Sequence, residues 1–241
     1  MSGHSRWAQI KRKKGATDTK RGQMFTRLIK EIVIASRLGG PDPEGNARLR
    51  LAIERARKSS MPVDNIKRAV ARGSGTDGGT AFEELVYEAY GPGGVAIMIE
   101  TATDNRNRTI GEIRHITSKY GGNVGESGSV GWMFAKKGII VIPKAGQDED
   151  QLLTIALDAG ADDLKTDDAE YFEIQTTPEQ FEAVLKAINT AGIPVEEDKV
   201  GLIASTTVKV EEADAEKLSK LIEMLEDNED VQNVYSNAEF T

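Results

Sequence analysis

GIIVIP, residues 138–143, is the stretch from which the fold is most readily worked out, because its apolar run predicts a buried strand. The elements predicted after it are a helix over Asp148–Ala159, strands near Asp163–Thr166 and Tyr171–Gln175, a helix over Pro178–Ala191 and a strand over Glu196–Ser205. Together with the opening strand they make a complete βαββαβ unit, which is the ferredoxin-like order.

A second set of elements lies on both sides of this unit. Before it we expect strands over Glu83–Tyr90 and Val95–Thr103, a glycine-rich turn at 91–94, a helix over Arg106–Tyr120 and a strand near Ser129–Phe134. After it we expect a strand over Thr207–Val210, a helix over Ala213–Asn228 and a strand over Val231–Ser236. The sequence therefore predicts two ferredoxin-like α+β domains. One is a discontinuous domain of residues 79–136 plus 205–241, and the other, residues 137–204, is inserted into it.

The N-terminal part is different, because its apolar residues recur at helical spacing. Helices are predicted over Asp18–Leu38, over Asn46–Lys58 and from Pro62 to Gly73, and a glycine-rich linker, GSGTDGGT, follows at 73–80. None of the three helices could bury its apolar stripe alone, so they are expected to form one bundle. Residues 1–17 lack apolar periodicity and are expected to be a flexible arm. The predicted class is thus α+β, with residues 1–78 as a separate basic arm and three-helix domain.

Charge is distributed very unevenly along the chain. The net charge is −8, yet residues 1–75 contain 18 Lys and Arg against 6 Asp and Glu, whereas residues 76–241 contain 13 against 33. The inserted unit alone has 15 acidic residues against 5 basic ones. Such asymmetry predicts a basic module that binds nucleic acid or another anionic surface and is attached to an acidic body.

Composition limits the remaining function classes. The chain has 241 residues, 39% of them hydrophobic, and no run near the roughly 18 apolar residues of a membrane span. The N-terminus has no apolar segment typical of a secretory signal. The absence of cysteine excludes disulfides, thiolate catalysis and cysteine-ligated zinc. We expect a soluble cytoplasmic protein with no cofactor and no bound metal.

The sequence offers little support for catalysis. Its two histidines are His4 in the arm and His115 in a predicted helix, where a surface or half-buried residue is expected rather than a general base. No phosphate-binding loop with a following Lys-Ser/Thr pair is present, and GESGSVG at 125–131 has the wrong glycine spacing for a dinucleotide site. We therefore predict that the protein is not an enzyme. An enzyme on the acidic α+β scaffold remains a third, disfavoured hypothesis.

The candidate nucleic-acid-binding residues in the N-terminal part are cations, with one aromatic residue. In the arm and the start of the first helix they are Arg6, Trp7, Lys11, Arg12, Lys13, Lys14, Lys20 and Arg21. Trp7 either packs back on the first helix or stacks on a base. In the bundle they are Arg48, Arg55, Lys67, Arg68 and Arg72. The second and third helices resemble a helix-turn-helix in spacing, with Asn65, Lys67, Arg68 and Arg72 as candidate base readers.

Two further candidates, Arg106 and Arg108, follow a predicted helix cap at Asp104 or Asn105. Cations in a first helical turn oppose the helix dipole, at a cost of about 0.3–1 kcal/mol each. One interpretation is that both arginines, with Thr103 and Asn107, contact phosphate or an acidic group of a partner. The alternative is that they pair with the surplus acids of their own domain.

Several long motifs carry a resemblance to a known family. They are GHSRWAQIKRKKG, KRGQMFTRLIKEI, GGPDPEGNARLRLAI, MPVDNIKRA, YEAYGPGGVAIMIE, TDNRNRT and the final glycine-rich run that ends in WMF. Over its whole length the chain resembles the YebC/PmpR family, which includes the mitochondrial translational activator of cytochrome c oxidase subunit one. The resemblance implies a helical N-terminal domain and two α+β modules. Arg6 stands where the family commonly has lysine, which preserves the charge.

The resemblance implies two functions that draw on the same basic module. Many family members are described as DNA-binding transcriptional regulators, so the first hypothesis is a non-enzymatic regulator that binds duplex DNA. Other members are described as ribosome-associated translation factors, so the alternative is a protein that binds ribosomal or transfer RNA and assists elongation at proline-rich stalls. A flexible cationic arm suits folded RNA better than a groove. The acidic domains would face solvent or dock proteins.

Overall fold

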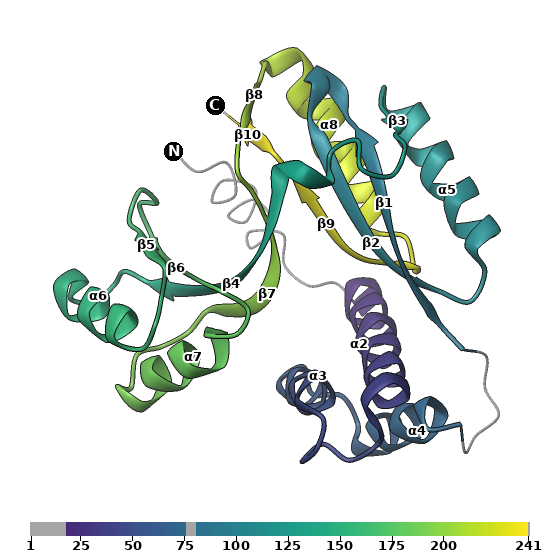
Figure 1. Cartoon of the computed structure of the whole chain (residues 1–241). Helices are drawn as coiled ribbons and strands as arrows, with labels where there is room; N and C mark the ends of the chain where they lie inside the picture. The colour runs from purple at the N-terminus through teal and green to yellow at the C-terminus, as the bar shows by residue number, and fades with distance from the viewer. Residues whose placement is uncertain (1–17, 76–80, 241) are drawn as a thin grey trace. The chain divides into compact units, whose positions relative to one another are not determined.

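The computed structural model describes residues 18–75 and 81–240, with side chains in the first helix from residue 22 onward. Within these residues the chain forms two compact units (Figure 1). The first unit comprises the described residues up to Val130 together with Glu212–Val234. The second comprises Gly131–Glu211 and the end of the chain from Tyr235.

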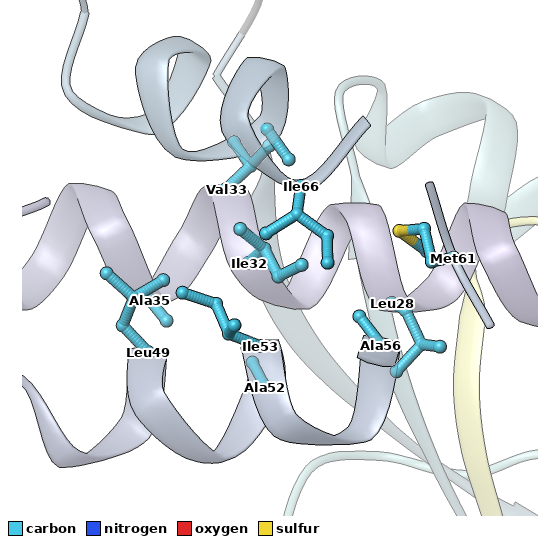
Figure 2. Packing of buried hydrophobic residues seen from close by; sticks show 11 residues of the cluster. Leu28, Ile32, Val33, Ala35, Leu49, Ala52, Ile53, Ala56, Met61 and Ile66 are labelled. Carbon is cyan, nitrogen blue, oxygen red and sulfur yellow. The ribbon is translucent and has the colours of Figure 1, made fainter. Parts of the chain in front are cut away.

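The first unit begins with the predicted helices, α2 (Asp18–Gly39), α3 (Ala47–Lys58) and α4 (Val63–Gly73). Both α3 and α4 pack against α2 and contact each other much less. Figure 2 shows the resulting core, formed by Leu28, Ile32, Val33, Ala35, Leu49, Ala52, Ile53, Ala56, Met61 and Ile66. The apolar stripe of α2 is therefore buried from two sides, as the helical spacing predicted.

Two local features fix the ends of these helices. The buried Asn46 side chain accepts a hydrogen bond from the Leu49 amide at 3.0 Å, which caps α3, and donates to the Ala35 carbonyl at 2.8 Å. At the end of α4, a β-carbon on Gly73 would lie 2.4 Å from the Val33 carbonyl oxygen. Only glycine allows α4 to approach α2 this closely.

The sheet of the first unit has the strand order β3-β1-β2-β9. Its strands are β1 (Glu83–Tyr90), β2 (Ala96–Thr103), β3 (Asn123–Val124) and β9 (Val231–Ser236), and a short turn at Pro92–Gly94 joins β1 to β2. Helices α5 (Arg106–Lys119) and α8 (Glu212–Glu226) pack on one face, where Ile113 and Leu218 are fully buried. The inward residues of β2 on that face include Ile97 and Thr103.

The second unit contains β4 (Phe134–Pro143), α6 (Glu149–Asp158), β5 (Asp163–Lys165), β6 (Tyr171–Thr176), α7 (Phe181–Thr190) and β7 (Glu197–Ala204). The strand order is β5-β6-β4-β7, and every neighbouring pair is antiparallel. Ile140, Phe172 and Phe181 lie in the core between sheet and helices. This is the ferredoxin-like arrangement predicted from GIIVIP and the elements after it.

The prediction of a strand near Ser129–Phe134 was wrong. Residues Gly131–Met133 form a single 3₁₀ turn, β4 begins at Phe134, and the short β3 pairs with β1 instead. The physical reason lies in Glu88, a buried residue of β1. Its carboxylate accepts hydrogen bonds from the amides of Gly128 at 2.7 Å and Val130 at 2.6 Å. These amides are satisfied by a side chain, so the GESGSVG segment is a loop around an internal anion.

The C-terminal strands also differ from expectation. Strand β8 (Val208–Val210) does not join the four-stranded sheet of the first unit. It pairs in parallel with β10 (Ala238–Phe240), a strand that the periodicity did not predict. The α+β class, with N-terminal helices followed by sheet domains, is confirmed. The domain boundaries at 78, 136 and 204 stay a prediction.

A buried carboxylate joins the bundle to the sheet inside the first unit. Asp230, between α8 and β9, accepts a hydrogen bond from Lys30 Nζ of α2 on one oxygen, at 2.7 Å. Its other oxygen accepts from Arg108 and Thr109 of α5, each at 2.7 Å, and from Thr103 of β2 at 3.2 Å. The single carboxylate of Asp230 therefore binds both α2 and the segment from the end of β2 to the start of α5, which are far from it in the sequence.

This network determines the ionisation of Asp230. Burial alone would raise the pKa of Asp230, but hydrogen bonds from Lys30, Arg108 and Thr109 together outweigh burial and lower the pKa to about 2. Because folding lowers the pKa, the ionised group stabilises the fold above the unfolded-state value near 3.8, and this contribution is lost as the pH falls toward 2. The shift corresponds to about 2 kcal/mol.

We predict that Asp230→Asn lowers the free energy of unfolding by about 3 kcal/mol at neutral pH, because Lys30 would remain buried without a counter-charge. The difference between variant and wild type should shrink as the pH falls from about 4 to about 2. Urea unfolding followed by circular dichroism across this range measures both effects. Asp158→Asn, at an exposed position, is the matched control. A difference that stays constant with pH would contradict the role given to Asp230.

Candidate nucleic-acid interface

Eight of the predicted nucleic-acid-binding residues cannot be placed by their side chains. Arg6, Trp7, Lys11, Arg12, Lys13 and Lys14 lie outside the described residues. Lys20 and Arg21 fall near the start of α2, and their side chains also lie outside the described part. The geometry of the interface therefore concerns the other seven, on α3, α4 and α5.

Two arginines of α3 form ion pairs with carboxylates of the same unit. Arg48 donates two hydrogen bonds to Glu84 at the start of β1, one of them at 3.0 Å, and this pairing raises the pKa of Arg48. Arg55 lies 3.1 Å from a carboxylate oxygen of Glu31 on α2. Both pairs are partly exposed, and such pairs contribute about 0–1 kcal/mol. A phosphate group can compete for these guanidinium groups at little cost to the fold.

Arg72 of α4 has a structural partner. Its guanidinium carbon lies 4.6 Å from the centre of the Phe82 ring, and Lys30 lies 5.4 Å from the same ring. Phe82 is packed against the core of the bundle just before β1 begins. Arg72 thus helps to attach the segment before β1 to the helices, in addition to any contact with a ligand.

The outward side of α4 carries Lys67 and Arg68, both exposed. Arg68 donates to Asn65 Oδ1 at 2.6 Å and to the Asp64 carbonyl at 3.3 Å, so two of the candidate base readers bind each other. Lys67 has no carboxylate within 4 Å in the ranges 22–75 and 81–240. Of the four candidate readers, Lys67 is the one whose polar group faces solvent without a partner there.

The two arginines at the start of α5 differ in their partners. Asn105, one of the two predicted candidates, is the N-cap of α5. Its side-chain oxygen accepts a hydrogen bond from the Arg108 amide at 3.1 Å. Arg108 pairs with Asp104 at 2.9 Å and Asp230 at 2.7 Å, the arrangement that the alternative interpretation predicted. The Arg106 side chain is 67% exposed, and its Nε lies 4.0 Å from a carboxylate oxygen of Glu83.

Asn107 and Thr103, the two residues proposed to act with these arginines, differ in their exposure to solvent. Asn107 is exposed, whereas Thr103 is buried and its hydroxyl is hydrogen-bonded to Asp230. Thr103 therefore stabilises the fold and cannot reach a phosphate. Sequence reasoning missed two exposed cations further along α5, Arg114 and Lys119. The available signal for Arg114 was its helical spacing from Asn107, seven residues earlier.

Other kinds of site receive no support from the described residues. Within them, no group of three His, Asp or Glu side chains lies close enough together to hold a metal ion. His115 is exposed on α5. Among the helices of the described ranges, none has both the length and the apolar character needed to cross a bilayer.

We predict that Arg108→Gln and Arg106→Gln differ in their effect on stability. Losing the Arg108 side chain removes a charged donor from Asp230, so the free energy of unfolding should fall by about 1 kcal/mol. Arg106→Gln should change it by less than about 0.5 kcal/mol, because the residue is exposed and weakly paired. Denaturant unfolding of both variants measures this contrast. Equal effects would show that the Arg108–Asp230 pair has no structural importance.

Comparisons with known proteins agree with this architecture. Residues 5–76 match the family model described as the TACO1/YebC protein N-terminal domain, and residues 82–238 match the model described as the TACO1/YebC second and third domain. A crystal structure of a conserved hypothetical protein from Aquifex aeolicus is 44% identical, with a TM-score of 0.84 over 93% of this chain and 92% of that chain.

Curated relatives are similar along their whole length. A probable transcriptional regulatory protein of Chlorobaculum tepidum is 55% identical, and one of Chloroherpeton thalassium is 56% identical, each over 100% of this chain and 96% of the relative. A protein of the same description from Desulforamulus reducens is 53% identical over 99% of both chains. On these matches, the chain belongs to the TACO1/YebC family.

Proposed function

We propose that this protein is a non-enzymatic regulator of gene expression that binds nucleic acid through its N-terminal basic part. The observation that carries the proposal is the charge asymmetry, 18 basic against 6 acidic residues in 1–75 and 13 against 33 in the rest. The relatives named probable transcriptional regulatory proteins support a regulator at the level of the family. Contacts of cations with backbone phosphates would supply most of the affinity.

The end of α3 and the first part of α4 offer a surface suited to such contacts. Residues 57–68 contain the exposed cations Arg57, Lys58, Lys67 and Arg68, and Asp64 is the single carboxylate in this range. The partly exposed, paired Arg48 and Arg55 lie on the same helix as Arg57 and Lys58. Phosphate binding here needs no rearrangement of the buried core.

The second unit is unsuited to binding a polyanion. Three of its lysines pair internally, Lys137 with Asp162, Lys165 with Asp163 and Lys199 with Glu197. Lys144 donates to the Thr166 carbonyl and lies over the Phe172 ring. The remaining acidic surface repels phosphate, which favours orientations in which the basic part meets the nucleic acid.

The first candidate ligand is duplex DNA, in keeping with the names of the relatives. A specific observation favours the second candidate, structured ribosomal or transfer RNA bound on the ribosome. Asn65 and Arg68 bind each other, and Arg72 stacks on Phe82, so base-specific reading by α4 has few side chains available. Phosphate contacts position a protein without specifying sequence. Such binding suits a folded RNA, for example on ribosomes stalled at proline-rich sequences.

We predict that Lys11→Gln/Arg12→Gln/Lys13→Gln/Lys14→Gln combined with Lys67→Gln/Arg68→Gln weakens nucleic-acid binding at least tenfold near physiological salt. The log–log salt slope should also become shallower, by about 0.9 for each lost phosphate contact on duplex DNA. Fluorescence anisotropy with a labelled DNA duplex and a labelled RNA hairpin measures both quantities. Asp158→Asn, which changes charge in the acidic unit, should leave binding unweakened. Undiminished binding by the six-residue variant would overturn the proposal.

The two ligands are separated by footprinting on duplex DNA alongside co-sedimentation with ribosomes. Sequence-selective protection of DNA without ribosome association supports a transcriptional regulator. Ribosome association that the six-residue variant loses, without selective protection of DNA, supports a translation factor.

A further inference from the structure

Helix α5 is a basic element within the acidic part of the chain. Its 14 residues include Arg106, Arg108, Arg114, His115 and Lys119 but one carboxylate, Glu112. In contrast, residues 76–241 as a whole have an excess of 20 acidic residues. A local reversal of charge on one helix needs a physical explanation.

The orientation of α5 places most of this charge in solvent. Thr109, Ile113 and Thr117 are buried against the rest of the first unit, one helical turn apart. On the opposite side Asn107, Gly111, Arg114 and Ser118 are exposed, at the spacing of a single helix face. Arg106 and Lys119, at the two ends of the helix, are also exposed and lie on either side of this face. In Figure 1, α5 has a long side that no other helix of the first unit covers.

Pairing within the chain does not neutralise this face. Arg108 forms ion pairs with Asp104 and Asp230. Glu112, the acid of this helix, accepts a hydrogen bond from Asn228 at 2.7 Å. In the ranges that the structure describes, Arg114 and Lys119 have no carboxylate within 4 Å. Arg106 reaches Glu83 at the 4.0 Å limit, where attraction in water is weak. Three of the cations therefore keep their charge available for a partner.

The shape of the face suits a close approach of phosphate groups. Gly111 lies in its middle, and a β-carbon there would meet open space. Asn107 and Ser118 add hydrogen-bonding groups of short reach on either side. Tyr87 on β1 lies close enough to Arg106 and Arg114 for their charges to act on its hydroxyl. Burial raises the pKa of Tyr87, and the nearby charges of Arg106 and Arg114 oppose that rise.

The buried Asp230 carboxylate connects the helical bundle to α5. Lys30 of α2 and Arg108 of α5 each lie 2.7 Å from an oxygen of Asp230. Helix α2 of the bundle and helix α5 therefore both bind Asp230, and both belong to the same compact unit. A single nucleic acid held by the bundle would meet α5 at a high effective concentration.

We propose that the exposed surface of α5, with Asn107 and Arg114 on its outward face and Arg106 and Lys119 beside that face at the two ends of the helix, is a second surface that binds the phosphate backbone of a nucleic acid. The proposal rests on the proposed function, since it concerns the same ligand, and it assigns part of the binding to the otherwise acidic region. The ligand chemistry is the phosphodiester group, which DNA and RNA share. Contacts of this kind add affinity and fix orientation without reading sequence.

The test is the triple variant Arg106→Gln/Arg114→Gln/Lys119→Gln in the full chain. Its affinity for a labelled 20-base-pair DNA duplex or an RNA hairpin should fall about tenfold at 0.1 M salt. The log–log salt slope should become shallower by about 2–3, in line with three lost phosphate contacts. The probe that shows the loss identifies which nucleic acid α5 binds.

The matched control is Lys136→Gln/Lys209→Gln/Lys217→Gln, which removes the same charge at three exposed positions outside α5. Circular dichroism and thermal unfolding of both triple variants establish that the fold is retained. The inference is overturned if the α5 variant loses no more affinity or salt dependence than this control.

A second comparison separates this inference from the proposed function. If the variant of the arm and α4 binds like wild type while the α5 variant binds weakly, the N-terminal proposal fails and the α5 surface stands. If the arm and α4 variant is weak and the α5 variant binds like the control, the opposite holds. If the wild-type protein binds neither probe at 50 mM salt, both proposals are overturned.

Discussion

One buried carboxylate determines how the first unit is assembled. Asp230 is almost wholly removed from solvent, yet it stays ionised because Lys30, Arg108, Thr109 and Thr103 all donate to it. A buried charge that loses a partner is expensive, so the four donors cannot separate easily. The helical bundle, the start of α5 and the connection between α8 and β9 are therefore held in one arrangement. The bundle owes its position to this ion pair as well as to apolar packing.

That constraint divides the cations of the chain into two classes. Lys30 is buried beside Asp230, Arg72 lies over an aromatic ring, and the half-exposed Arg108 pairs with Asp230, so all three stabilise the fold. Lys67 and Arg114 are exposed and form no ion pair with a carboxylate in the part of the chain that the structure describes. A basic residue near a proposed interface is thus informative only when its internal partners are known. The same holds for acids, since the Glu88 carboxylate accepts the backbone amides of a glycine-rich loop that resembles a phosphate-binding loop in composition.

Much of the architecture could be predicted because it depends on local patterns. The ferredoxin-like unit followed from apolar runs and turns, and the three N-terminal helices followed from the spacing of residues such as Leu28 and Ile32. The failures were elements that depend on distant partners. Strand β10 exists because β8 lies beside it, and residues 131–133 turn instead of extending because Glu88 binds the amides before them. Neither partner is visible in the local sequence.

The sequence by itself determined the α+β class, the helical start of the chain and the separation of basic from acidic segments. These properties depend on composition and on short-range periodicity, which are independent of tertiary contacts. Only the tertiary structure decided which charges are already neutralised. Arg106 and Arg108 are two residues apart in the same helical turn, yet one faces solvent and the other binds Asp230, 122 positions further along the chain. Pairing over that distance arises from folding, and it determines which cations remain available to a ligand.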